Sequence, residues 1–112
     1  MINRRSGSGL MRWLLFILVF CAGAAQARDS VAGKAKAGMC ASCHGPLGMS
    51  QLPNAPHLAG QPAIYLAEQL KNYRSGKRPH EVMAVIAKPL TDTDIDDLAA
   101  WYASIQIAVS EK

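Results

Sequence analysis

The sequence CASCH at positions 40–44 places two thiols and an imidazole close together in the chain. On a helical turn, residues i, i+3 and i+4 share a face, so Cys40, Cys43 and His44 can all contact one planar group. Two thiols at this spacing can add across the two vinyl groups of a haem, while the imidazole takes one axial position on its iron. The pentapeptide therefore predicts the covalent attachment of one c-type haem.

Three other uses of these cysteines fit the surrounding residues less well. A thioredoxin-like redox pair needs strand and helix surroundings, which the neighbouring sequence does not predict. Structural zinc needs four nitrogen or sulfur ligands, and only His57 and His80 remain downstream. A disulfide between Cys40 and Cys43 would close a very short loop and would restrict the unfolded chain little.

The second axial position decides whether small molecules can reach the iron, because a filled position blocks them. Met83 lies 39 residues beyond His44, so the chain between them can wrap to the opposite face of the haem. Met39 adjoins the attachment turn on the His44 side, and Met49 follows that turn too closely to cross easily. Met83 could also be a core plug, the usual role of methionine in an apolar stretch. The candidates for the sixth ligand are Met39, Met49, His57, His80 and Met83, with His80 the next contender after Met83.

Apolar periodicity predicts an all-α chain with a middle section rich in loops. Four prolines and three glycines between positions 45 and 62 exclude a long helix there. The clearest helix is the last, where Thr91 and Asp94 form a near capping box before a regular apolar stripe. The expected helices are residues 30–43, capped by Asp29 or Ser30, residues 63–74, one or two turns within 81–87, and the segment after Thr91.

The first 27 residues have the pattern of a cleaved signal peptide. Three arginines precede an apolar run that is short for a membrane span, and Ala25-Gln26-Ala27 matches a small-x-small cleavage site. Cleavage would remove three of the 12 basic residues and leave nine against eight acidic ones. The basic footprint typical of nucleic-acid binding would then largely disappear. We expect residues 28–112 to form a single mature domain, exported to the periplasm.

Three stretches of the chain resemble the class I c-type cytochromes, which are small bacterial electron carriers. They are CASCHG, PNAPHLAGQPAIYLAEQLKNYRSGKR and MAVIAKPLTDTDIDDLAAWYAS, in that order. Together they cover nearly all of residues 30–107, and the likeness is greatest to one half of the two-haem periplasmic cytochromes or to their single-haem relatives. The resemblance implies a class I cytochrome c fold, with three to four helices wrapped around one covalently bound haem c.

The resemblance also assigns roles to individual residues. It implies His44 and Met83 as the axial ligands of the haem iron, with the thioethers on Cys40 and Cys43. It implies that the backbone carbonyl of Pro56 accepts the other ring N–H of His44. Leu58 would pack on the haem, and Tyr65 and Arg78 would approach its edge or propionates. Gly33 would allow the first and last helices to cross closely, against Trp101 or Tyr102.

The function expected from these features is one-electron transport in the periplasm, without catalysis by the chain itself. Donors would be a membrane quinol-oxidising complex or a dehydrogenase, and acceptors a terminal oxidase or reductase. The chain would meet membranes only by docking and would not bind nucleic acid. Two alternatives remain open: a haem-based ligand-binding or sensing protein, and a dedicated cytochrome subunit of a respiratory enzyme.

Overall fold

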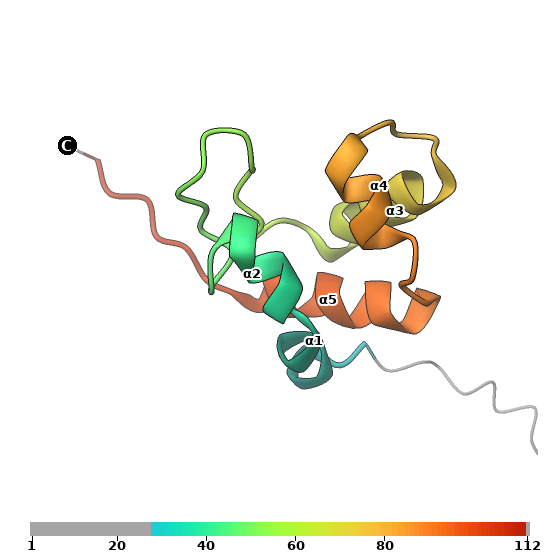
Figure 1. Ribbon diagram of the computed structural model, residues 1–112. Helices are drawn as coiled ribbons and strands as arrows, with labels where there is room; N and C mark the ends of the chain where they lie inside the picture. Colours follow the sequence, from blue (N-terminus) through green and yellow to red (C-terminus); the bar gives the residue numbers. More distant parts are fainter. Residues whose placement is uncertain (1–27, 112) are drawn as a thin grey trace, which may run out of the picture.

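The computed structural model describes residues 28–111, so the predicted signal peptide 1–27 lies outside the described residues. The described chain contains five helices and no strand (Figure 1). None of these helices is long and apolar enough to cross a membrane. The helices are α1 (Ser30–Lys36), α2 (Gly38–His44), α3 (Ala63–Ser75), α4 (Glu81–Ala87) and α5 (Asp92–Ser104).

The expected three to four helices become five because the segment 30–43 is divided at Ala37. The backbone of Ala37 has φ −75° and ψ −2°, and its amide bonds to the Lys34 carbonyl three residues back, at 3.2 Å. This tight turn ends α1, and the Ala37 carbonyl then accepts the first hydrogen bonds of α2. The break lets α1 lie against α5 while α2 takes another direction (Figure 1).

Helices α1 and α5 pack closely enough to require a glycine. Gly33 is buried on α1, and a Cβ atom built there would meet the backbone of Asp97 and the Cβ of Trp101. Lys36 reaches across the same contact and pairs with Asp97 at 2.8 Å and with Asp94 at 2.9 Å. The expected close crossing of the first and last helices is therefore present, with Trp101 as the aromatic neighbour.

The helix starts follow the sequence signals. Asp29 caps α1 by accepting hydrogen bonds from the amides of Val31 and Ala32. Thr91 and Asp94 form a complete reciprocal capping box at the start of α5. Both devices satisfy backbone donors that a helix leaves unpaired at its first turn.

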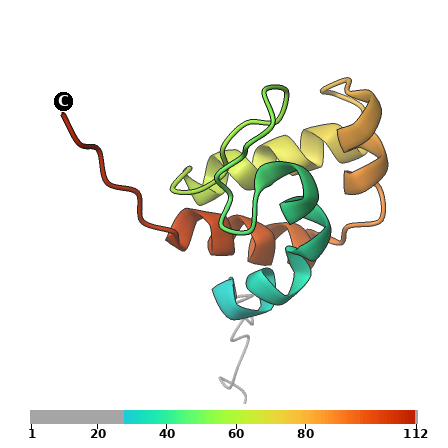
Figure 2. The ribbon, with the colours of Figure 1, turned by 60° about the vertical axis from the view of Figure 1, so that its left-hand side comes forward.

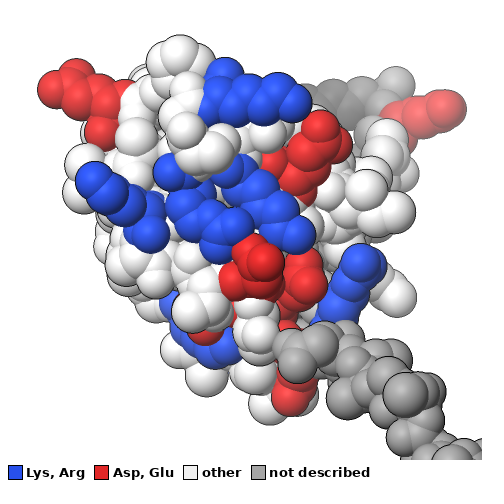
Figure 3. Space-filling view, turned by 90° about the vertical axis from the view of Figure 1, so that its right-hand side faces the viewer, with Lys and Arg blue, Asp and Glu red and all other residues white. Residues whose placement is uncertain are grey.

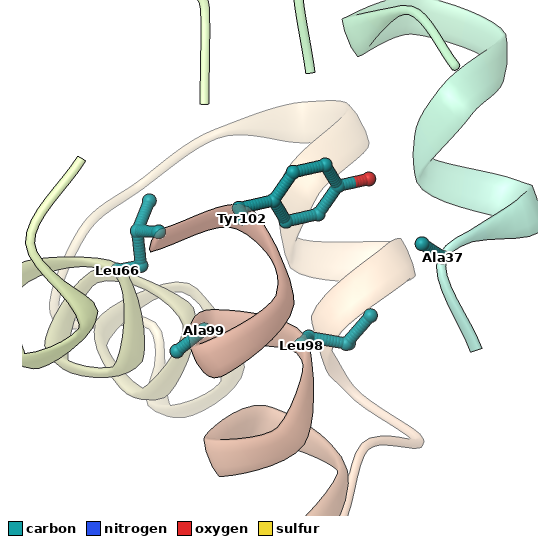
Figure 4. Close-up of a cluster of buried hydrophobic side chains, with 5 residues drawn as sticks. All are labelled: Ala37, Leu66, Leu98, Ala99 and Tyr102. Atoms are coloured by element: carbon teal, nitrogen blue, oxygen red, sulfur yellow. The ribbon is translucent and has the colours of Figure 1, made fainter. Parts of the chain in front are cut away.

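The apolar core is small and centres on α5. Five buried side chains from α5, α3 and the turn at Ala37 form one cluster (Figure 4). Figure 4 shows the Tyr102 ring reaching from α5 towards the segment that carries Ala37. Among the described residues, Ile95 and Leu98 are the largest side chains that are fully buried. The cluster consists of Ala37, Leu66, Leu98, Ala99 and Tyr102.

The irregular segment between α2 and α3 forms a long loop (Figure 2), which is held together by its own hydrogen bonds. Gly48 has a φ of 73°, and its carbonyl accepts from the amides of Leu58 and Ala59 at 2.8 and 3.1 Å. The Ser50 hydroxyl donates to the Cys43 carbonyl at 2.9 Å. These bonds fold the loop back on itself and anchor it to the end of α2.

Candidate haem site

A cavity of about 320 Å³ opens between α2, the following loop, α3, α4 and α5. Every residue that the sequence predicts around the haem lines this cavity. They come from α2, the segment after it, α3, the connection from α3 to α4, and α4, and the fold brings them together. These residues are Cys40, Cys43, His44, Pro56, Leu58, Tyr65, Arg78 and Met83.

Helix α2 presents the two cysteines to the cavity as free thiols. Cys40 is partly buried and Cys43 is exposed. Burial raises the pKa of the Cys40 thiol, with a smaller opposing contribution from Tyr102. Both sulfur atoms are therefore available for bonds to a ligand in the cavity. Among residues 28–111, no three His, Cys, Asp or Glu side chains converge as a metal-binding group.

His44 is oriented by the loop that follows it. Its ring is only 8% exposed, and its Nδ1 lies 2.8 Å from the carbonyl oxygen of Pro56. A carbonyl can only accept, so Nδ1 carries the proton and Nε2 keeps its lone pair. The ring thus has a free nitrogen donor while its other nitrogen is fixed, the arrangement usual for a histidine that binds a metal.

Met83 lines the same cavity from α4 and is partly buried. The backbones of α2 and α4 do not approach each other closely, so His44 and Met83 reach the cavity from separate helices. Met39 also lines the cavity but stands beside Cys40 on α2, with 54% of its surface exposed. Met49 does not line the cavity and is 43% exposed.

The two remaining histidines each use Nδ1 to accept a backbone hydrogen bond. His57 accepts from the amide of Ser50 at 2.8 Å. His80 accepts from the amide of Met83 at 3.1 Å and so caps α4. The second contact is a feature that sequence reasoning missed, because histidine is not among the preferred capping residues.

The remaining predicted residues form the apolar wall and the rim. Leu58 packs against the core cluster, whereas Tyr65 is 44% exposed. Arg78 donates to the side-chain oxygen of Gln69 at 2.9 Å, and its guanidinium lies 4.7 Å from the centre of the Tyr73 ring. Arg78 is therefore held in place by α3 and is not simply a solvated charge.

Tyr102 is a further cavity residue whose place in the site the sequence did not reveal. It is 3% exposed, and its hydroxyl has no hydrogen-bond partner in the described chain. Burial is the main cause that raises the pKa of this hydroxyl, and the neighbouring Cys40 side chain adds to the effect. The Cys40 thiol, a weak hydrogen-bonding group, is thus the neighbour of this hydroxyl, and both side chains line the cavity.

The residues present fit a covalent haem. Two free thiols, an imidazole with one free nitrogen and a thioether line one apolar cavity. A haem in the cavity would also add to a small core, because a domain of this length buries only about 60–65% of its unfolded surface. The fold and the site together define a small all-α protein whose interior is built around a prosthetic group.

Comparison with known proteins agrees with this class. The family model named Cytochrome c matches residues 30–106. Cytochrome c4 of Thiocapsa roseopersicina is 48% identical over 84 residues, covering 74% of this chain and 43% of that protein. Cytochrome c-554(548) of Halomonas halodenitrificans is 43% identical over 81 residues, covering 70% of this chain and 98% of that protein. The thiosulfate dehydrogenase electron acceptor of Stutzerimonas stutzeri is 39% identical over 69 residues, covering 59% of this chain and 32% of that protein.

A solved structure shows the same fold. Reduced recombinant cytochrome c4 from Pseudomonas stutzeri matches with a TM-score of 0.69 and 37% sequence identity, covering 74% of this chain and 48% of that chain. The chain thus spans less than half the length of the cytochrome c4 proteins it matches. It belongs to the cytochrome c family, which implies a covalently bound haem c. The predicted all-α cytochrome c fold is confirmed, with five helices in the described residues.

Proposed function

We propose that this chain is a periplasmic one-electron carrier with a single haem c, attached through Cys40 and Cys43 and ligated by His44 and Met83. The observation that carries the proposal is the position of the two ligands. His44 and Met83 line one cavity from two helices whose backbones do not approach each other closely. A group that fills this cavity can therefore meet an imidazole from one wall and a thioether from another.

The protein's own residues hold the group and shield it. The thiols of α2 supply the covalent attachment, and the Pro56 carbonyl keeps the His44 ring in one tautomer. Leu58 and the core side chains of α3 and α5 exclude water from the interior. When bound, a haem with histidine and methionine ligands supplies one-electron chemistry at a raised reduction potential. If His44 and Met83 both bound the iron, they would keep small ligands from it, which would favour electron transfer over gas binding or sensing.

The location and the partners are part of the same proposal. Residues 1–27 would direct export and then be removed, leaving residues 28–112 as the mature cytochrome domain. One relative is named as the electron acceptor of thiosulfate dehydrogenase, which supports a redox enzyme as one partner of this chain. The donor would be a dehydrogenase or a membrane quinol-oxidising complex, and the acceptor a terminal oxidase or reductase. The protein would dock on membrane complexes without entering the bilayer, and it would not bind nucleic acid.

The test is to export the chain together with a haem-attachment system and to count haems and electrons. We expect the purified chain to begin at Arg28 and to gain the mass of one haem. A potentiometric titration should follow a one-electron curve, and the reduced protein should bind carbon monoxide slowly. Replacing both cysteines by alanine should abolish covalent attachment. Rapid carbon monoxide binding by the parent protein would instead favour a ligand-binding or sensing function. Co-purification with one fixed enzyme would identify a dedicated subunit.

A further inference from the structure

His80 contacts the residue that we propose as the sixth ligand. Its backbone is extended, with φ −166° and ψ 126°, as expected for a residue that precedes a helix. Its Nδ1 accepts a hydrogen bond from the Met83 amide at 3.1 Å, while its carbonyl accepts from the Ala84 amide at 3.0 Å. The His80 side chain is therefore attached to the backbone of Met83 itself.

The His80 ring is in turn held by α3. It meets the Tyr73 ring edge to face, with the ring centres 5.8 Å apart and the planes at 79°. The guanidinium of Arg78 lies over the same Tyr73 ring, at 4.7 Å from its centre. Contacts of this kind favour one orientation of the rings. The column Arg78–Tyr73–His80 thus links α3 to the first turn of α4.

Helix α4 has little else to hold its first turn. It contains seven residues, and isolated helices of that length are marginal in water. Among the described helices, α3 is the one whose backbone lies close to that of α4. Its only buried residue is Ala87 at the far end, whereas Val82 and Val85 are 55% and 71% exposed. Within the protein itself, the cap at the Met83 amide is therefore one of the contacts that hold Met83 in place.

We propose that His80 is a positioning residue for Met83: its Nδ1 caps α4 at the Met83 amide and so keeps the thioether directed into the cavity. This inference rests on the proposed ligation by Met83. It also gives His80 a role other than that of a rival ligand. The Nδ1 atom accepts the Met83 N–H, and the ring packs against Tyr73.

The experiment compares cyanide binding to the ferric holoprotein in a set of variants. His80→Ala removes both the ring and the acceptor, His80→Phe keeps an aromatic ring without the acceptor, and His80→Asn restores an acceptor that caps helices well. We expect cyanide to bind about fivefold faster in His80→Ala and His80→Phe, because the form with Met83 off the iron becomes more populated. This factor is about 1 kcal/mol, the usual cost of removing a capping side chain. His80→Asn should stay within about twofold of the parent.

Asp29→Ala is the matched control, because it removes the side-chain cap of α1. It should lower the unfolding temperature by a similar amount to His80→Ala but leave the cyanide rate unchanged. The inference is overturned if His80→Ala and His80→Phe bind cyanide at the parent rate, if His80→Asn behaves like them, or if Asp29→Ala shows the same acceleration.

The parent spectrum separates this inference from the proposed function. If the ferric parent lacks the weak red band of iron bound to methionine sulfur, ligation by Met83 is wrong, and the role of His80 is wrong with it. If the parent has the band and the His80 variants keep the parent cyanide rate, the positioning role alone is wrong.

Discussion

Replacement of Gly33 by alanine tests how the crossing of α1 and α5 supports the site. A Cβ at this position would lie 2.6 Å from the carbonyl carbon of Asp97 and 2.8 Å from the Cβ of Trp101. It would lie closer still to the carbonyl oxygen of Asp97. Ordinary carbon contacts are about 3.5–4.0 Å, so the helices must separate by roughly 1 Å. The atoms in the way are backbone or attached directly to it, so no change of rotamer can relieve the clash.

The expected cost lies at the upper end of measured overpacking, about 3 kcal/mol. For a domain of this size, that free energy lowers the melting temperature by about 12–24 °C. The separation would also strain the ion pair between Lys36 and Asp97, which spans the same helices. Thermal unfolding of the holoprotein, followed by circular dichroism, measures this loss.

Gly38→Ala is the matched control. Gly38 begins α2, and a Cβ built there has no atom within 4 Å. This variant should be neutral or slightly more stable, by at most about 1 kcal/mol, because alanine is favoured over glycine in helices. A melting temperature of Gly33→Ala equal to that of Gly38→Ala would refute the packing model.

Two further predictions concern charge. Hydrogen bonds from the Thr91 amide, the larger cause, and from Lys36 lower the pKa of Asp94 from 3.8 to about 2. The Asp94 carboxylate therefore stabilises the fold above pH 4, and this stabilisation is lost as the pH falls towards 2. Denaturation measured between pH 5 and 2 should show this loss, and Asp94→Asn should reduce its slope; an unchanged slope would contradict it. Figure 3 shows basic side chains grouped at the centre of one face, with acidic side chains beside them. Exposed Lys77 lies in the connection from α3 to α4, whose Arg78 and His80 line the cavity. The rate of electron transfer with an acidic partner should therefore fall several-fold as salt rises to 1 M. This fall should be smaller in Lys77→Glu than in the control Lys34→Glu on α1. Rates that do not depend on salt would exclude electrostatic steering.

Local signals in the sequence were sufficient for most of the helices and for the cysteine and histidine attachment motif. The Asp29 cap and the Thr91–Asp94 box depend on residues at most three positions apart, so the printed sequence displays them directly. The proline- and glycine-rich stretch predicted the irregular segment for the same reason. The family likeness then indicated which distant residues the fold would bring together.

Other features depend on contacts between distant elements and have no local signal. The break at Ala37 arises because α1 must follow α5 while α2 turns towards the cavity, and the alanine itself is a good helix former. The apolar stripe of the last helix included Tyr102 but could not show that its hydroxyl would be buried beside Cys40 at the cavity. The capping role of His80 depends on the Tyr73 ring from another helix.

The most direct test of the central claim is the visible spectrum of the ferric and ferrous holoprotein, with Met83→Ala and Met39→Ala measured alongside. Met39→Ala is the matched control, since Met39 also lines the cavity but stands on α2 beside Cys40. We predict sharp bands of a reduced c-type haem and a weak red band in the ferric parent, kept in Met39→Ala and lost in Met83→Ala. A high-spin ferric spectrum without the red band, or a red band that survives in Met83→Ala, would contradict the assignment of Met83 as the sixth ligand.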